Sequence, residues 1–293
     1  MRIPATLDWW RSVPRGGAWL DSLPTAVEAC CDAWSLTLGE PFSGGNVALV
    51  VRVTRHDGSP AVLKLSFPDD ESEHEPEALT HWAAAGAVRL LDHDPGRRAM
   101  LLERADPATP LWEVADDVVA TRIAAGVLRR LHAVPVAPAH RFRLLSDAAA
   151  RWQETIPADW ETAGRPYPRR LAELAQEACR SIEVGAKEVV LHQDFHGGNV
   201  LRAGDDWLVI DPKPLVGDPA FDAASLLRDR RWLMGRLDDA RRIRRRLDLL
   251  VDVTGLDRER MRLWGVVHAL AWGVSGTKVE PDMVRCAELL AAS

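Results

Sequence analysis

Apolar and β-branched runs separated by turn residues characterise the first hundred positions of the chain. Four such runs predict strands, at residues 46–53, 61–65, 88–91 and 99–103. Residues 56–59 and 94–96 have turn composition, so each pair of strands is expected to be joined locally. Between the pairs, residues 71–85 are rich in helix formers and begin with acidic residues, as the helix dipole favours. This part of the chain is therefore predicted to be strand-rich with one internal helix.

The rest of the chain has mainly helical patterning. Residues 1–40 are predicted to be helical, with four tryptophans as packing anchors: Trp9, Trp10, Trp19 and Trp34. After Arg104, segments rich in Ala, Leu and Arg predict helices at residues 111–133, 143–156, 168–183 and from 219 onward. Short strands are predicted among them at residues 189–191, 200–201 and 207–210. We therefore expect an α+β fold with a small N-terminal lobe (residues 1–104) and a larger, helical C-terminal lobe (residues 105–293).

Composition narrows the class of protein. Hydrophobic residues make up 47% and charged residues 27%, which is typical of a globular protein. The net charge of −6 argues against a general nucleic-acid binder. The apolar run at residues 263–274 is too short to span a membrane, and residues 1–12 lack the apolar core of a secretory signal. The four cysteines have no metal-ligand spacing, so we expect reduced thiols in a cytoplasmic, monomeric protein without membrane partners.

Lysine and asparagine are rare in this chain. Only four of the 37 basic residues are lysine, and there are two asparagines. This chain uses arginine for almost all of its positive charges. Each lysine or asparagine that it keeps is therefore examined for a chemical role. The positions are Lys64, Lys187, Lys213, Lys278, Asn46 and Asn199.

The segment VLHQDFHGGNVL at residues 190–201 fits the pattern H-x-D-x-x-x-x-N on His192, Asp194 and Asn199. Asp211 follows twelve residues after Asn199, at the end of an apolar run. Phosphoryl transfer to a hydroxyl needs an acceptor for the substrate proton and Mg²⁺ ligands that offset phosphate charge. Asp194 is predicted to be the acceptor, with Asn199 and Asp211 as the Mg²⁺ ligands. Turn-stabilising Asp and Asn residues are the alternative for the loop alone, but the ordered set favours the chemistry.

Lys64 is the only lysine among the first 186 residues, and it sits centrally in an apolar predicted strand. A kinase needs a compact ammonium there to hold the α- and β-phosphates, together with a helix carboxylate that orients it. Glu75 and Glu77 both qualify, but residues at i and i+2 do not share a helix face. Glu75 is preferred because Leu79 at i+4 anchors the same face. A surface lysine with a buried stem remains the alternative.

Two further segments are candidates for nucleotide contacts. The loop at residues 42–47 contains Gly44 and Gly45, which would allow phosphates to approach the backbone closely. It does not match G-x-G-x-x-G, so a plain turn is the alternative. Residues 101–105 join the two lobes, and the backbone near Glu103 and Ala105 could pair with an adenine edge, although a simple connector would have the same sequence.

The order of these elements resembles the aminoglycoside-phosphotransferase branch of the protein-kinase-like fold. The segments AVLKLSFP, EPEALTHWAAAGAVRLLDHD, AMLLERA and LVIDPKPLVGDPAFDAASLLRD more closely resemble the aminoglycoside/hydroxyurea antibiotic-resistance kinases, which include streptomycin 6-kinases. The resemblance covers about residues 20–275. It implies a set of roles: Asp194 as catalytic base, Asn199 and Asp211 as Mg²⁺ ligands, Lys64 as phosphate clamp with Glu75 as its partner, and Glu103 to Ala105 as the adenine hinge.

Two departures from the family pattern stand out. Gln193 occupies a position where many aminoglycoside kinases have glycine, and Asp211-Pro-Lys replaces Asp-Phe-Gly. The loss of Phe-Gly removes the flipping element of regulated protein kinases and suggests a constitutively formed site. Lys213 is expected either near the phosphates or paired with Asp218 or Asp222.

The resulting hypothesis is an ATP- and Mg²⁺-dependent kinase that phosphorylates a hydroxyl of a small, cationic acceptor, most simply streptomycin or a relative. Hydroxyurea or an endogenous metabolite is the alternative acceptor, and a pseudokinase is the alternative class. A cationic acceptor needs carboxylates and aromatic faces, for which the candidates are Asp147, Trp152, Glu154, Asp159, Trp160, Trp264, His268 and Trp272. The last three share a helix face by their spacing, which is more typical of core packing. The arginine run at residues 241–246 is predicted to be a solvated helix face.

Overall fold

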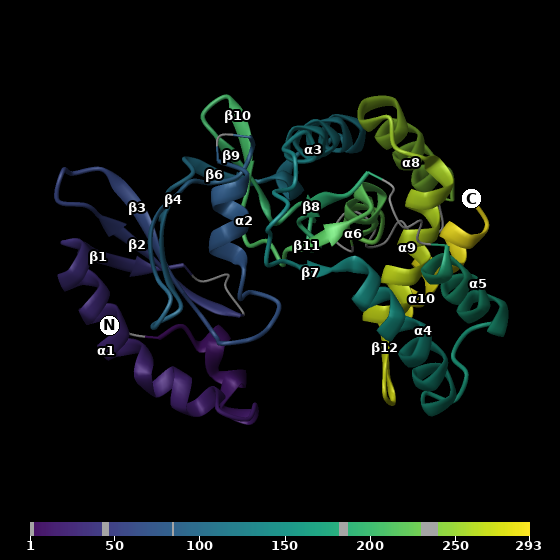
Figure 1. Cartoon of the computed structure of the whole chain (residues 1–293), viewed down its shortest axis with the longest axis horizontal. Coiled ribbons are helices and arrows are strands. Elements are labelled where there is room, and N and C mark those ends of the chain that lie inside the picture. The colour runs from purple at the N-terminus through teal and green to yellow at the C-terminus, as the bar shows by residue number, and fades with distance from the viewer. Residues whose placement is uncertain (1–2, 43–46, 84, 182–186, 230–239) are drawn as a thin grey trace. The chain divides into compact units, whose positions relative to one another are not determined.

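The computed structural model of the chain describes residues 3–42, 47–83, 85–181, 187–229 and 240–293 (Figure 1). The chain divides into two compact units, Met1–Asp106 (unit 1) and Pro107–Ser293 (unit 2). Within the described residues, no helix combines the length and the apolar character that crossing a membrane requires.

Unit 1 is built on an antiparallel sheet of five strands in the order β1-β2-β3-β5-β4. The strands are β1 (Thr37–Pro41), β2 (Ala48–Thr54), β3 (Pro60–Ser66), β4 (Leu90–Asp94) and β5 (Ala99–Glu103). The predicted hairpin is confirmed, and its register places Val50 opposite Lys64. Strand β1 was not predicted, because residues 37–40 were assigned to a helix. That helix ends earlier, at Ser35, whose left-handed backbone (φ 52°) redirects the chain into the sheet.

The core of unit 1 lies between one face of this sheet and the two amino-terminal helices, η1 (Ala5–Ser12) and α1 (Gly16–Trp34). Alternate residues of β2 and β3, such as Val51 and Leu63, are fully buried against α1. Trp10 stacks on Phe67 with ring centroids 4.1 Å apart. The prediction that all four tryptophans anchor the core is wrong for Trp9, which is 46% exposed.

The internal helix of unit 1, α2 (Glu75–His81), is shorter than the predicted residues 71–85. The carboxylate of Asp69 accepts hydrogen bonds from both the backbone N–H and the hydroxyl of Ser72, which orders the preceding residues as a turn. Pro76 then occupies the first turn of the helix, where a missing N–H costs nothing.

Unit 2 contains three small sheets (Figure 1). One has the strand order β10-β9-β6 and another the order β7-β11-β8, while β12 and β13 form a hairpin. The strands are β6 (Pro107–Pro110), β7 (Arg143–Leu144), β8 (Val189–Leu191), β9 (Val200–Ala203), β10 (Asp206–Val209), β11 (Leu215–Gly217), β12 (Val274–Ser275) and β13 (Lys278–Val279). The predicted strands β8, β9 and β10 are confirmed, whereas the other strands of unit 2 were not predicted.

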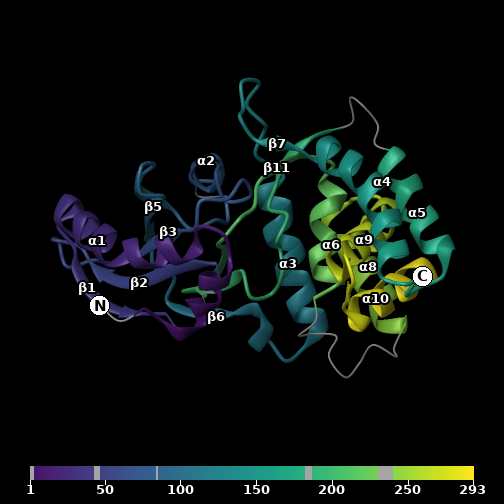
Figure 2. The ribbon, with the colours of Figure 1, turned by 90° about the horizontal axis from the view of Figure 1, so that it is seen from below.

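Most of the rest of unit 2, as far as the structure describes it, is helical, as predicted. The helices are η2 (Leu111–Glu113), α3 (Asp117–Leu131), α4 (Leu145–Thr162), α5 (Arg169–Arg180), η3 (Pro219–Asp222), α6 (Ala223–Leu227), α8 (Ala240–Thr254), α9 (Arg258–Gly273) and α10 (Pro281–Ala291). Helix α9 packs against α4, α5, α6, α8 and α10, so it forms the centre of this unit (Figure 2). Its central position explains why α9 is buried almost all round.

The arginine run was predicted to be solvated, and this is wrong for Arg246. Its side chain is 1% exposed on the inner side of α8 and pairs with Asp117 at the start of α3. The helical period turns one arginine of the run inward, and an inward charge requires a partner.

Candidate active site

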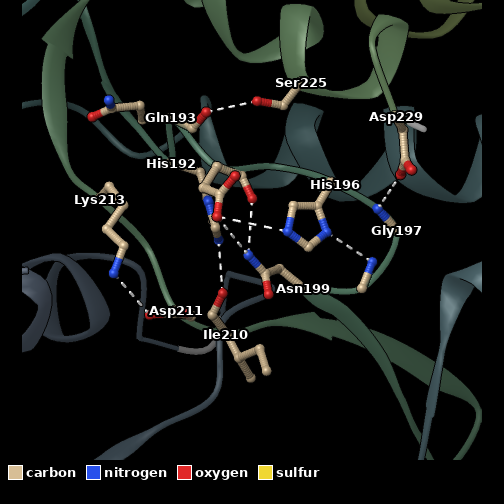
Figure 3. A network of polar contacts seen from close by, with 12 residues as sticks. His192, Gln193, His196, Gly197, Asn199, Ile210, Asp211, Lys213, Ser225 and Asp229 are labelled. Carbon is tan, nitrogen blue, oxygen red and sulfur yellow. Dashed lines mark hydrogen bonds and ion pairs between the residues drawn. The ribbon is translucent and has the colours of Figure 1, made fainter. Parts of the chain in front are cut away.

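Residues 192–199 form a loop between the buried strand β8 and strand β9 (Figure 3). Its ends are fixed by backbone hydrogen bonds to the segment that follows β10. Lys213 N–H donates to the carbonyl of His192 at 3.0 Å, and Ile210 N–H donates to the carbonyl of Asn199 at 3.0 Å. These bonds place Asp211 beside the loop.

Asp222 holds the beginning of this loop in place. Its fully buried carboxylate accepts hydrogen bonds from the backbone N–H groups of His192 (3.0 Å) and Gln193 (2.8 Å), and His132 lies 2.9 Å from the same carboxylate. From the sequence, Asp222 was expected only as a partner of Lys213. The ammonium of Lys213 instead contacts Asp211 Oδ1 at 3.2 Å. The signal for Asp222 was a lone carboxylate in an otherwise apolar stretch, which must be satisfied internally.

Gln193 has a left-handed backbone, with φ 65°. A side chain in this conformation costs roughly 1–2 kcal/mol, which explains why glycine suits the position in many aminoglycoside kinases. Here the Gln193 carbonyl accepts a hydrogen bond from the Ser225 hydroxyl at 2.7 Å, and its amide oxygen accepts one from Arg143 at 3.3 Å. These contacts with two other segments offset the strain.

His192 is fully buried, and its Nε2 lies 3.0 Å from the carbonyl oxygen of Ile210. Burial lowers the pKa of this imidazole, in spite of the nearby carboxylates of Asp222 and Asp194. His192 is therefore neutral, and its contact with the Ile210 carbonyl supports the loop.

The Asp194 carboxylate is ionised and partly exposed, with 32% of its side chain accessible. Burial opposes its charge, but the hydrogen bond from His196 and the charge of Arg228 outweigh burial and hold the pKa of Asp194 well below its usual range. Oδ2 lies 3.6 Å from His196 Nε2 and 3.4 Å from Asn199 Nδ2, and Oδ1 lies 3.6 Å from an Arg228 nitrogen. Such a carboxylate can accept a hydrogen bond from an incoming hydroxyl.

Asn199 and Asp211 offer oxygen ligands next to Asp194. The amide nitrogen of Asn199 donates to the backbone carbonyl of Asp194 at 3.0 Å, which directs the amide oxygen away from that carbonyl. Asp211 has a left-handed backbone (φ 59°), and 24% of its side chain is exposed. Among the described residues, no group of three His, Cys, Asp or Glu could hold a metal. One carboxylate and one amide fit Mg²⁺, which takes its remaining ligands from water and phosphate.

His196, although not singled out from the sequence, is part of a rigid loop apex. Its ring stacks on Trp112 with centroids 5.0 Å apart and an interplanar angle of 5°. Asp229 accepts hydrogen bonds from Trp112 Nε1 (2.7 Å) and from the N–H of Gly197 (2.8 Å). A β-carbon at Gly198 would lie 2.5 Å from the Trp112 ring, so only glycine fits there. This packing fixes His196 against Asp194.

In unit 1, Lys64 and Glu75 form a buried ion pair. The ammonium contacts both carboxylate oxygens, at 2.6 and 2.7 Å, and the two residues are 5% and 0% exposed. Because side chains alternate along β3, Lys64 points to the face of the sheet opposite the aromatic core, and Glu75 meets it from α2. The side chain of Glu77 is half exposed and lies 3.6 Å from His74 instead.

The other residues predicted to contact the nucleotide are Glu103, Ala105, Gly44 and Gly45. Both carboxylate oxygens of Glu103 are bonded to Arg89, at 3.0 Å (backbone) and 2.6 Å (side chain), so this side chain braces the end of β5. Ala105 is buried. Gly44 and Gly45 lie outside the described residues.

Most candidates for acceptor binding serve packing. Trp264 donates to Asp218 at 2.7 Å and Trp160 donates to the Tyr167 carbonyl at 2.8 Å, and both tryptophans are buried. Asp159 accepts from the N–H of Gly276 at 2.9 Å and so tethers the β12–β13 hairpin. Asp147 and Glu154 are exposed on α4.

The helix face shared by Trp264, His268 and Trp272 is packed at two of its three positions. His268 is fully buried, whereas Trp272 is 39% exposed. Trp272 stacks on His268 with centroids 3.9 Å apart and meets the edge of Trp152 at 5.6 Å. The exposed part of Trp272 therefore gives α9 an aromatic surface.

Comparisons with known proteins identify the family. The family model "Aminoglycoside/hydroxyurea antibiotic resistance kinase" matches residues 34–280. Streptomycin 6-kinase of Streptomyces glaucescens is 42% identical over 85% of this chain and 81% of that protein. Hydroxyurea phosphotransferase of Kitasatospora aureofaciens is 38% identical over 90% of this chain and 77% of that protein.

The structural comparison confirms the expected protein-kinase-like α+β fold. The aminoglycoside phosphotransferase APH(3'')-Id of Streptomyces rimosus, solved in complex with ADP and streptomycin, superposes with a TM-score of 0.59. Its sequence identity is 22%, and the match covers 87% of this chain and 99% of that chain. The predicted family is also confirmed: the chain belongs to the aminoglycoside/hydroxyurea antibiotic resistance kinases.

Proposed function

We propose that this protein transfers the γ-phosphate of ATP to a hydroxyl group of an aminoglycoside, with streptomycin or a close relative as the acceptor. The observation that carries the proposal is the ionised, partly exposed Asp194 carboxylate next to the oxygen ligands of Asn199 and Asp211. The similarity to streptomycin 6-kinase over 85% of the chain supports this acceptor. Because ATP is supplied inside the cell, we place the reaction in the cytoplasm.

Asp194 is the catalytic base in this proposal. Its carboxylate accepts a hydrogen bond from the acceptor hydroxyl, orients the hydroxyl oxygen toward the phosphate and takes up the proton as the new bond forms. Asn199 and Asp211 would hold Mg²⁺, which would offset the charge on the phosphates. Lys213, on Asp211, adds a positive charge beside the same ligands.

The residues of unit 1 hold the nucleotide. Lys64 binds the α- and β-phosphates, and Glu75 fixes the direction of its ammonium group. The backbone from Glu103 to Ala105 binds the adenine, and Gly44 and Gly45, which lie outside the described residues, are the further candidates for phosphate contact. The side chain of Glu103 is committed to Arg89, which leaves backbone groups for this role.

Hydroxyurea is the second candidate acceptor, because a hydroxyurea phosphotransferase is 38% identical over 90% of the chain. A pseudokinase is disfavoured, since Lys64, Asp194, Asn199 and Asp211 are all present. An endogenous metabolite would need the same catalytic residues and differ only in the acceptor pocket.

A screen of acceptors with ATP and Mg²⁺ tests the proposal. Streptomycin, other aminocyclitols, hydroxyurea and simple polyols are compared by ADP release and by mass spectrometry of the product. Streptomycin is expected to gain one phosphate, and EDTA is expected to abolish the reaction. Phosphorylation of hydroxyurea but no aminocyclitol would transfer the assignment to the second candidate. Failure with every acceptor in the screen would exclude both named candidates and leave an endogenous metabolite as the acceptor.

The exposed part of Trp272 is expected to contact the acceptor. A guanidinium over an indole gains about 0.5–2 kcal/mol, so Trp272→Ala should raise KM for streptomycin roughly 2- to 30-fold, with KM for ATP unchanged. Trp272→Phe should recover most of the loss. Trp9→Ala removes an exposed tryptophan of unit 1 and is the matched control. Equal effects of the Trp272 and Trp9 substitutions on KM for streptomycin would contradict this role.

A further inference from the structure

Arg228 lies next to the proposed base, although the sequence pattern did not select it. It follows α6 directly, its side chain is 13% exposed, and one guanidinium nitrogen lies 3.6 Å from Asp194 Oδ1. The other oxygen of the same carboxylate faces Asn199 and His196. Arg228 therefore occupies the side of Asp194 that the catalytic loop itself does not fill.

His268 fixes the direction of this arginine from α9. Arg228 Nε–H donates to His268 Nδ1 at 2.6 Å. Because Nδ1 accepts this bond, the imidazole must be neutral and carry its proton on Nε2. Burial and the charge of Arg228 lower the pKa of His268 well below its ordinary value, which agrees with this assignment.

The imidazole is in turn held on both its face and its edge. Its ring lies parallel to Trp272, with centroids 3.9 Å apart, and its Nε2 is 3.5 Å from the Ser225 hydroxyl. Ser225 donates to the carbonyl of Gln193, the residue before Asp194. Trp272 and Ser225 thus hold the imidazole in the orientation in which Nδ1 faces Arg228.

The guanidinium group suits this place because it is planar and has donors in several directions. Its Nε–H donates to His268, while a terminal nitrogen faces Asp194. Because the group is planar, the hydrogen bond to His268 also sets the direction of the nitrogen that faces Asp194. A lysine has a single nitrogen and cannot meet both residues in the same way. The carboxylate of Asp194 is consequently restrained on both oxygens.

Given the proposed function, we propose that Arg228, fixed by His268, is a positioning residue that holds the Asp194 carboxylate in the orientation that accepts the hydroxyl proton. A carboxylate that can rotate spends less time aligned with the hydroxyl, and small misplacements of catalytic groups are costly. The pair therefore connects the buried helix α9 to the chemical step.

Four substitutions in this chain test the inference. Arg228→Met should lower kcat by roughly 10- to 100-fold, with KM for ATP changed less than about twofold. Arg228→Lys should not restore kcat. His268→Phe keeps a ring on Trp272 but removes the acceptor, and kcat should fall. His268→Asn, whose amide oxygen can take the place of Nδ1, should retain more activity than His268→Phe.

A double variant and a control separate positioning from simple stabilisation. Arg228→Met combined with His268→Phe should be no slower than Arg228→Met alone, because the two residues act in series. Arg262→Met removes another arginine of this unit with a similarly buried side chain, 11% exposed and paired with Glu259. It should lower the melting temperature and leave kcat unchanged. Unchanged kcat in Arg228→Met, or full additivity in the double variant, would overturn the inference.

A measurement that does not depend on enzyme turnover tests the Arg228–His268 contact independently of the proposed function. In ¹⁵N NMR, the Arg228 Nε–H signal should be protected from solvent exchange in the wild type and in Asp194→Asn, and exposed in His268→Phe. A signal that exchanges freely in the wild type overturns the inference whatever the activity. If no acceptor is phosphorylated while this signal is protected as expected, the proposed function fails and the Arg228–His268 contact stands.

Discussion

Asp194→Asn is expected to lower kcat for phosphate transfer by roughly 10²- to 10⁴-fold, the usual contribution of a positioned general base. Asparagine has nearly the same shape, but its amide cannot take up the proton of the acceptor hydroxyl. ATP binding should persist, since the residues proposed to hold the nucleotide are unchanged. The measurements are kcat from ADP release and the Kd for ATP from calorimetry.

The matched control is Asp206→Asn on β10. The side chain of Asp206 is 63% exposed and pairs with Arg130 at 3.1 Å. Surface pairs of this kind contribute little to stability, so the control should behave as wild type. Turnover in Asp194→Asn within a few fold of wild type would remove Asp194 as the base.

Lys64→Met is expected to have a large effect on both catalysis and stability. The ATP phosphates would lose their proposed clamp, so kcat/KM for ATP should fall by orders of magnitude. Glu75, which is 0% exposed, would also lose the ammonium that contacts both of its oxygens. Removing one partner of a buried ion pair costs roughly 3–5 kcal/mol, so the melting temperature should fall as well.

A second substitution separates the two effects. Lys64→Met combined with Glu75→Leu removes the uncompensated charge, so stability should largely recover while kcat/KM for ATP stays low. Lys278→Met, at a side chain that is 77% exposed, is the lysine control and should change neither quantity. Near-wild-type use of ATP by the Lys64 variants would contradict the kinase assignment. A double variant no more stable than Lys64→Met would contradict the proposed origin of the stability loss.

Features that depend on residues close together in the sequence could be predicted from it. The β2–β3 hairpin follows from two apolar runs around a turn, and its register then places Lys64 in the middle of a strand. The spacing of Asp194 and Asn199 within one loop is likewise a local pattern. The scarcity of lysine and asparagine pointed toward Lys64 and Asn199, although Lys278 proved to be an exposed surface residue.

Residue type and hydrophobic pattern were poorer predictors of the features that depend on tertiary packing. Strand β1 was missed because it follows a helix without a distinct strand pattern, and its place depends on pairing with β2. Helix α2 is shorter than its composition suggested, since a side-chain contact of Asp69 competes with the helical backbone bonds. The inward position of Arg246 required Asp117, which is 129 residues away in the chain.

The sequence by itself therefore determined the family, the fold and the composition of the candidate catalytic loop. Only the tertiary structure decided what surrounds Asp194. Asp222, Arg228 and His268 lie 29 to 90 residues from their partners in the chain. Contacts of this length have no periodic signature, because they depend on how helices and strands pack and on the need to pair every buried charge. For that reason the candidate base could be proposed from its motif, whereas the side chains that surround it could not.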